Sequence, residues 1–406
     1  MKFKSIFAVR ILGLLFSFLL NIYVARTYPG STVGQYFYLV QIVTLVSIIA
    51  RFGSDTSLLK LAHTFNYKIK NDVLFFSSKI FVYIVSLHLF VYFFSLRILD
   101  FDFFNGSGFT VSQFLYIIIP FSITCYCSEY LRGVNEHNKA NFCQLILPPA
   151  LLIILISSTS SSLIYSYTVS VTMASLVSAF FYFKTTPSKP SLNNNIYSRY
   201  KQSLPTFFYI SVLNVGLSSI DIIALEAYSS SESVAIYGVA IRLSGLAAML
   251  LIIVNGIIGP TFSKLYEQKK INELVKNYQK ISLCLMIAAL LMLMLSIFFG
   301  EWFITIIYGE SYRNSYSIFC ILVLAQAFAL ATGPTAYLLM MTGYENYHRN
   351  ILIVSFFINL ILNLSLIPMY ELYGAAVATT FSIIIKNGLG LFVANKKFGI
   401  FKVKRV

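Results

Sequence analysis

The side chains in this sequence that could do chemistry are charged residues placed inside long apolar runs. Four are basic and two are acidic, and a charge at bilayer depth is costly unless it faces a bundle interior or water. Arginine offers phosphate oxygens a planar fork of donors. The excess of cations therefore predicts an anionic cargo, which a phosphate or diphosphate group fits. The six residues are Arg10, Arg51, Arg242, Lys386, Asp55 and Asp221.

Arg242 and Lys386 are the most informative of these residues. Arg242 follows Glu232 by ten residues and Lys386 precedes Lys396 by ten, which places each roughly 15 Å along a helix. Their own apolar runs contain no carboxylate, so each cation needs an anion from another helix or from a substrate. A water-filled cationic cavity is the favoured interpretation. Structural ion pairs hidden between helices are the alternative.

The charged residues near the chain start and both carboxylates lie on polar helix faces. Asp55 follows Arg51 by four residues, so the two could also form a purely structural ion pair. Asp221 is near the outer end of its run, so an interfacial carboxylate is the alternative there. The three polar faces are Arg10, Ser17 and Asn21; Gln41, Thr44, Arg51 and Asp55; and Ser211, Asn214, Ser218 and Asp221.

The elements that must position these residues are membrane helices. The chain has 406 residues, of which 58% are hydrophobic and 11% charged, whereas soluble proteins carry about 25% charged residues. This composition excludes an ordinary soluble enzyme, a disordered chain and a disulfide scaffold. It predicts an all-α polytopic membrane protein. Apolar runs between polar clusters give twelve spans, near 6–25, 35–58, 73–95, 111–131, 143–160, 163–183, 204–225, 235–260, 281–299, 316–341, 351–370 and 372–395.

The distribution of basic residues predicts the orientation. Of the 30 Lys and Arg residues, 22 fall in segments on the amino-terminal side and 3 on the opposite side. Because Lys and Arg accumulate in cytoplasmic loops, both termini are expected in the cytoplasm. The net charge of +15 has the same cause and does not indicate nucleic acid.

The midpoint of the chain suggests two halves of six spans each. We expect an amino-terminal lobe over 1–183, a polar, proline-broken cytoplasmic linker over 184–203, a second lobe over 204–395 and a basic cytoplasmic tail over 396–406. The polar stretch 266–280 is expected to form a surface helix. The halves also share a Gly-x5-basic turn, at 133–139 and 343–349, which favours duplication in one topology.

Signals of catalysis are missing from the sequence. The four histidines form no metal-spaced pair, the five cysteines fit small core hydrophobes, and the chain has no Walker loop. We therefore expect no catalytic residues, no metal site and no ATP hydrolysis by this chain.

A distributed pattern resembles one family of transporters. The stretches are DIIAL (221–225), VAIYGVAIRL (234–243), IIYG (306–309) with Tyr312, TGY (342–344), NLILN (359–363), IPMY (367–370) and YGAAVAT (373–379), and more loosely GQY (34–36), RFG (51–53) and LRG (131–133). With them the sequence resembles the multidrug/oligosaccharidyl-lipid/polysaccharide (MOP) flippase superfamily, in its Wzx-type O-antigen and capsule branch.

This resemblance implies two six-helix lobes around a central cavity, as in the MATE transporters of the same superfamily. It implies a bacterial inner-membrane flippase that moves an undecaprenyl-pyrophosphate-linked oligosaccharide, an O-antigen or capsule repeat unit, to the periplasmic leaflet by alternating access. Arginines of helices one, two and eight contribute to the cationic cavity of related lipid II flippases, and Arg10, Arg51 and Arg242 lie in those spans. A polysaccharide polymerase and a chain-length regulator are the implied partners.

No cofactor is implied beyond coupling to protons or sodium ions, for which Asp55 and Asp221 are the candidate carboxylates. Two alternatives remain open. A MATE-like small-molecule/ion antiporter usually carries cations, so it predicts acidic rather than basic cavity residues. A membrane glycan polymerase predicts that the purified protein incorporates labelled sugar into polymer.

Overall fold

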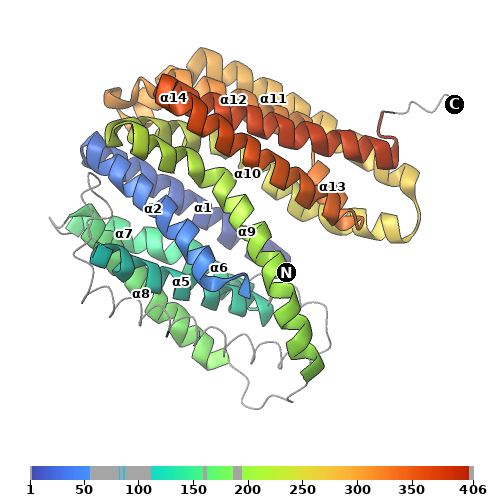
Figure 1. Cartoon of the computed structure of the whole chain (residues 1–406), viewed down its shortest axis with the longest axis horizontal. Coiled ribbons are helices and arrows are strands. Elements are labelled where there is room, and N and C mark those ends of the chain that lie inside the picture. The colour runs from blue at the N-terminus through green and yellow to red at the C-terminus, as the bar shows by residue number, and fades with distance from the viewer. Residues whose placement is uncertain are drawn as a thin grey trace. The chain divides into compact units, whose positions relative to one another are not determined.

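The computed structural model describes residues 2–54, 82, 86, 111–158, 162–185 and 194–401, and these form helices and short connections (Figure 1). Apolar runs become helices because a chain in hydrocarbon must pair its own N–H and C=O groups. Within the described residues, eight helices are long and apolar enough to cross a membrane, or nine if one bent pair counts as a span. The chain is thus a multi-pass membrane protein.

The helices follow the spans expected from the sequence. Of the expected span 73–95 only residues 82 and 86 are described, and the described part of every other span falls on helices. The serine-rich stretch after residue 156 does separate two helices, because α7 (Leu147–Ser158) ends there and α8 (Leu163–Thr185) begins beyond it. The second span is described through α2 (Gly30–Arg51) and the turn that follows it.

The first compact unit covers Met1–Val215. In it, α5 (Val111–Gly133) packs against both α2 and α8. Helix α1 (Lys2–Thr27) packs against one π-helical turn (Phe142–Ile146). The glycine of α1 permits this close approach, since a Cβ at Gly13 would collide with Leu145. The remaining elements of the unit are α6 (His137–Asn141) and the first part of α9 (Asn194–Tyr228).

The second compact unit covers Gly216–Val406, so the division between units falls inside α9. Within it, α12 (Ser315–Ala331) packs against three helices, α10 (Ser231–Glu267), α11 (Ile271–Tyr308) and α14 (Glu345–Phe398). A short 3-10 turn, Glu310–Tyr312, follows α11. Helix α13 (Thr335–Met341) comes between α12 and α14 in the chain.

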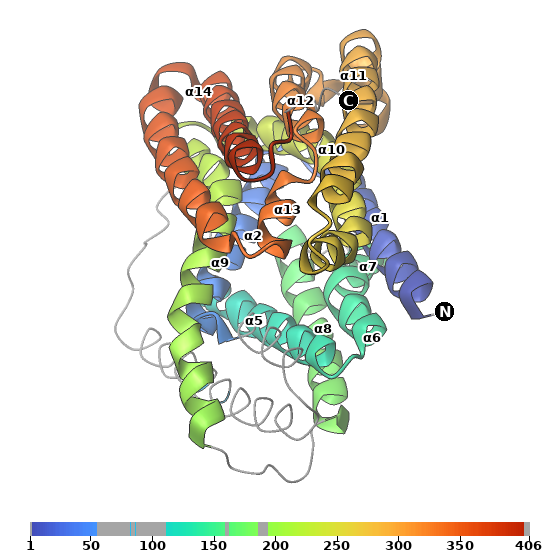
Figure 2. The ribbon, with the colours of Figure 1, turned by 90° about the vertical axis from the view of Figure 1, so that its right-hand side faces the viewer.

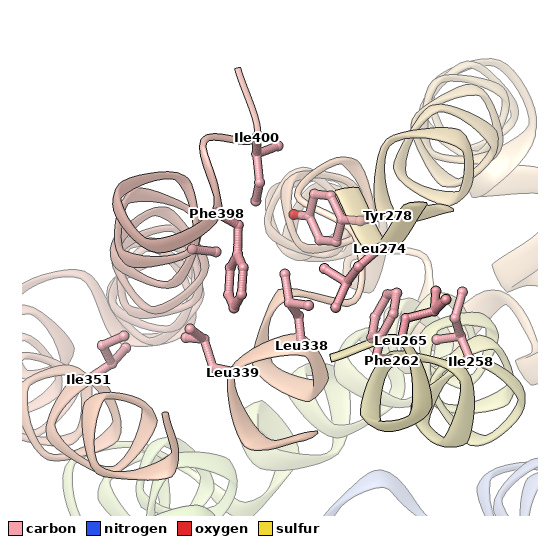
Figure 3. Packing of buried hydrophobic residues seen from close by; sticks show 11 residues of the cluster. Ile258, Phe262, Leu265, Leu274, Tyr278, Leu338, Leu339, Ile351, Phe398 and Ile400 are labelled. Carbon is pink, nitrogen blue, oxygen red and sulfur yellow. The ribbon is translucent and has the colours of Figure 1, made fainter. Parts of the chain in front are cut away.

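One end of the second unit is closed by an apolar cluster from four helices and the chain end. Figure 3 shows Phe398 and Ile400 beside Leu338, with Leu274 and Tyr278 facing them. The side-chain amide of Gln279 donates to the Ile400 carbonyl at 2.5 Å. This bond links Ile400, which follows α14, to α11.

The longest helix reverses direction at one residue. Glu371 has φ 45° and ψ −119° inside α14, and the two arms run back along each other (Figures 1 and 2). The expected boundary between the spans 351–370 and 372–395 is therefore confirmed. A Cβ at Gly374 would collide with the Leu366 carbonyl, so the arms meet there without room for a side chain.

Two sequence expectations differ from the structure. The stretch 266–280 is not a separate surface helix: α10 ends at Glu267, Lys269 takes φ 58° in the turn, and α11 continues from Ile271 into its span. It stays one helix because Leu274 and Tyr278 are buried in the core. The second half of the expected linker is also helical, since α9 begins at Asn194.

The expected lobe limits, 1–183 and 204–395, stay a prediction. Of the expected basic tail, Lys396 and Lys397 belong to α14, and 402–406 lie outside the described residues.

The close approach at Gly374 can be tested by substitution. We expect Gly374→Ala to destabilise the protein by about 1–3 kcal/mol, because overpacking forces the backbone to shift. Gly245→Ala is the matched control, since a methyl group added there would meet none of the described residues beyond its own helix turn within 4 Å and alanine favours a helix interior by roughly 0.5–1 kcal/mol. Thermal unfolding in detergent should separate the two variants, and equal midpoints would contradict this packing.

Candidate functional site: a buried carboxylate and two deep cations

Asp221 is a fully buried carboxylate held by hydroxyl groups. Its side chain is 0% exposed. The Tyr237 hydroxyl donates to Oδ2 at 2.6 Å and the Thr379 hydroxyl to the same atom at 3.2 Å. The backbone N–H of Ile222 donates to Oδ1 at 2.9 Å. Burial places Asp221 inside the second unit, and its depth in the membrane stays a prediction.

Three helices meet at this carboxylate: α9 supplies Asp221, α10 supplies Tyr237, and the second arm of α14 supplies Thr379. None of the ion pairs formed by the described residues includes Asp221. Among the described residues, the carboxylate is therefore stabilised by dipoles and not by a cation. Such a group is suited to binding a proton or a small cation, because either would neutralise it.

The polar face predicted around Asp221 is not uniform. Asn214 and Ser218 are exposed, whereas Asp221 and its neighbour Ser219 are buried. The Asn214 amide donates to the Ile210 carbonyl of its own helix at 2.9 Å. Asp221 thus faces the inside of the second unit, whereas Asn214 and Ser218, earlier on the same helix face, are exposed.

Arg242 is half-buried on α10 and bonded to its own helix. Its guanidinium donates to the Gly238 carbonyl at 2.9 Å. This carbonyl oxygen compensates part of the guanidinium charge. The expected contact of Arg242 with an anionic substrate stays a prediction.

Lys386 is half-buried on the second arm of α14. No hydrogen bond or ion pair within the described part of the chain involves Lys386. An ammonium group within a membrane helix is costly without an anion. Lys386 therefore fits the description of a cation that awaits an anion.

In the first unit, Arg51 and Arg10 differ in their surroundings. Arg51 is only 7% exposed, and its guanidinium donates to the Ser47 carbonyl at 3.0 Å and the Ser47 hydroxyl at 3.3 Å. Arg10 is exposed on α1. The predicted stripe beside it is partly linked, since the Asn21 amide donates to the Ser17 carbonyl at 2.6 Å. Asp55 lies outside the described residues, so the pairing of Asp55 with Arg51 stays a prediction.

Sequence reasoning missed the partners of Asp221 and a further polar stripe. Ser355, Asn359 and Asn363 lie on the first arm of α14, each at most 1% exposed. Neither polar atom of the Asn359 amide has a hydrogen-bond partner in the described structure. The spacing of four residues was the available signal, because it places all three side chains on one face of a helix.

The helices and this site define a fold class. The chain superposes on the lipid II flippase MurJ in its inward closed conformation with a TM-score of 0.75 at 18% identity, covering 97% of this chain and 87% of that one. It superposes on an inward-facing multidrug resistance MATE family transporter of the MOP superfamily with a TM-score of 0.69 at 13% identity, covering 99% of both chains. The fold is that of MOP superfamily transporters.

The sequence places the chain more narrowly. A model of the family described as "Polysaccharide biosynthesis protein" matches residues 2–266, and the chain belongs to that family. It is also 26% identical over 196 residues to the capsular polysaccharide biosynthesis protein CapF of Staphylococcus aureus, a match over 47% of this chain and 48% of that protein. The aligned chain thus spans about half the length of this curated relative.

The support that Tyr237 gives to Asp221 predicts a difference between two tyrosines. We expect Tyr237→Phe to destabilise the second unit by about 1–3 kcal/mol, because a buried carboxylate loses a donor. Tyr312→Phe is the control, since the Tyr312 hydroxyl is buried and without a hydrogen-bond partner among the described residues. Unfolding in denaturant or heat measures both, and equal losses would contradict the role of Tyr237.

Proposed function

We propose that the protein is a flippase for a polyprenyl-diphosphate-linked oligosaccharide in the bacterial cytoplasmic membrane. Family membership and the transporter fold support this proposal, and the observation that carries it is Lys386. This cation lies in a membrane helix with no hydrogen bond or ion pair in the described structure. A diphosphate supplies the anion that such a cation needs.

The proposed mechanism is alternating access between two lobes with both termini in the cytoplasm. The diphosphate binds cavity cations, for which Arg10, Arg51, Arg242 and Lys386 are the candidates. The glycan enters the hydrated space and the polyprenyl tail stays in lipid. Rocking of the lobes then opens the cavity to the other side. This route spares the sugar hydroxyls and the diphosphate from hydrocarbon, where each unpaired polar group is costly.

Coupling to an ion is proposed at Asp221, with Asp55 as the second candidate. The buried Asp221 carboxylate accepts from hydroxyl groups and pairs with no cation in the described ion pairs. Binding of a proton or sodium ion there would change the charge at the junction of α9, α10 and α14. A polysaccharide polymerase and a chain-length regulator are the proposed partners in the membrane.

The cation requirement is tested by Arg242→Ala and Lys386→Ala, each produced separately in a strain that lacks the wild-type chain. Losing one charge-assisted contact to a phosphate costs about 1.5–3 kcal/mol, so surface polysaccharide should fall roughly tenfold or more at normal expression. The control is Lys264→Ala, which removes an exposed lysine near the end of α10. Normal polysaccharide in both variants would remove these cations from the mechanism.

A direct assay distinguishes the rival functions. Proteoliposomes that hold the purified chain and a labelled polyprenyl-diphosphate oligosaccharide should make the glycan accessible on the second side. Polymer formed by the purified chain would favour a glycan polymerase, and transport of organic cations alone would favour the small-molecule antiporter.

In the same proteoliposomes, an imposed proton or sodium gradient should speed flipping by the wild-type chain. Asp221→Asn keeps the shape of the side chain but removes its charge, so we expect the gradient to have no effect on this variant. Flipping rates with and without the gradient give the measurement. Equal stimulation of both proteins would exclude Asp221 as the coupling residue.

A further inference from the structure

The helix pair α12 and α13 is broken at Gly333 and Pro334. The two helices are bent by 42° at this point. Pro334 has no N–H, and the Leu330 carbonyl, which that N–H would reach in a continuous helix, instead accepts the Gly333 N–H at 2.9 Å. Gly333 takes φ +70°, a conformation that glycine adopts without strain. The residue types at Gly333 and Pro334 therefore account for the break.

A tyrosine from α11 bonds to the backbone at this break. The Tyr278 hydroxyl donates to the Thr332 carbonyl at 2.5 Å. The Thr335 hydroxyl donates to the same carbonyl at 2.7 Å and lies 2.8 Å from the Tyr278 hydroxyl. A carbonyl released from a helix must find such donors when it is buried in a membrane protein.

The surroundings hold α11 directly against the break. A Cβ on Gly333 would collide with the Ser282 hydroxyl, one turn along α11 from Tyr278. The Tyr278 ring is buried in the apolar cluster that also contains Leu338 of α13 (Figure 3). The hydroxyl thus crosses from α11 to the start of α13, while the ring is anchored in the core.

We propose that the break at Gly333 and Pro334 is a hinge of the transport cycle, and that Tyr278 is a positioning residue whose hydroxyl holds α13 at its observed angle. This inference rests on the proposed transport function. The contact is reversible, because the Thr335 hydroxyl still donates to the Thr332 carbonyl when the Tyr278 hydroxyl moves away. The hinge can therefore move without leaving a buried acceptor unsatisfied.

The first test compares Tyr278→Phe with Tyr308→Phe in the full chain in lipid nanodiscs. Both tyrosines lie on α11 and are 1% exposed, but the Tyr308 hydroxyl has no hydrogen-bond partner among the described residues. Hydrogen exchange over 332–342 should be roughly two- to tenfold faster in Tyr278→Phe, as expected for one lost hydrogen bond. Equal exchange in the two variants would contradict the role of the Tyr278 hydroxyl as a latch, that is, as a contact that holds α13 at its observed angle.

The second test measures flipping by the same two variants in proteoliposomes. We expect a rate roughly two- to tenfold lower for Tyr278→Phe, because the chain spends less time in the latched conformation, and an unchanged rate for Tyr308→Phe. Faster exchange with unchanged flipping would overturn the hinge role. A wild-type chain that flips no lipid-linked glycan would overturn the proposed function instead, and hydrogen exchange alone would then decide whether Tyr278 is a latch.

Discussion

A carboxylate can stay inside an apolar bundle only where enough donors converge on it, and Asp221 sets this constraint on the second unit. The Tyr237 and Thr379 hydroxyls and a backbone N–H satisfy its oxygens. Because the donors come from different helices, α10 and the second arm of α14 are held against α9. The same bonds leave the negative charge without a cation, so the group stays available to a mobile ion.

The same requirement applies to backbone groups that leave a regular helix. At the break between α12 and α13, the Thr332 carbonyl is satisfied by two hydroxyls. Irregular backbone in a membrane protein is tolerated where the protein itself supplies partners. The break between α12 and α13 therefore lies against α11, which supplies one of these hydroxyls.

Much of the fold could be predicted because hydropathy alone determines where a chain can cross a membrane. The separation of α7 from α8 and the reversal at Glu371 were both expected from polar residues between apolar runs. The continuous α11 was not expected, since the burial of Leu274 and Tyr278 depends on α13 and the chain end, which the local sequence does not reveal. Helix continuity was decided by tertiary packing.

The site was only partly predictable for a similar reason. Depth along a helix identified Arg242 and Lys386, because distance from flanking charges can be counted in the sequence. The partners of Asp221 could not be counted in this way, since Thr379 follows it by 158 residues. Helical periodicity also grouped Asn214 and Ser218 with Asp221, but their exposure differs because neighbouring helices cover only part of that face.

The reversal of α14 at one residue also determines where the chain can accept a fused reporter. The two arms of α14 are in close contact at Leu366 and Gly374, with no room for an added side chain. A fluorescent or enzymatic domain inserted beside Glu371 would therefore separate them. Gln268, Lys269 and Lys270, between α10 and α11, are all exposed. Sidedness could therefore be mapped with an insertion at 268–270, which leaves the paired arms intact.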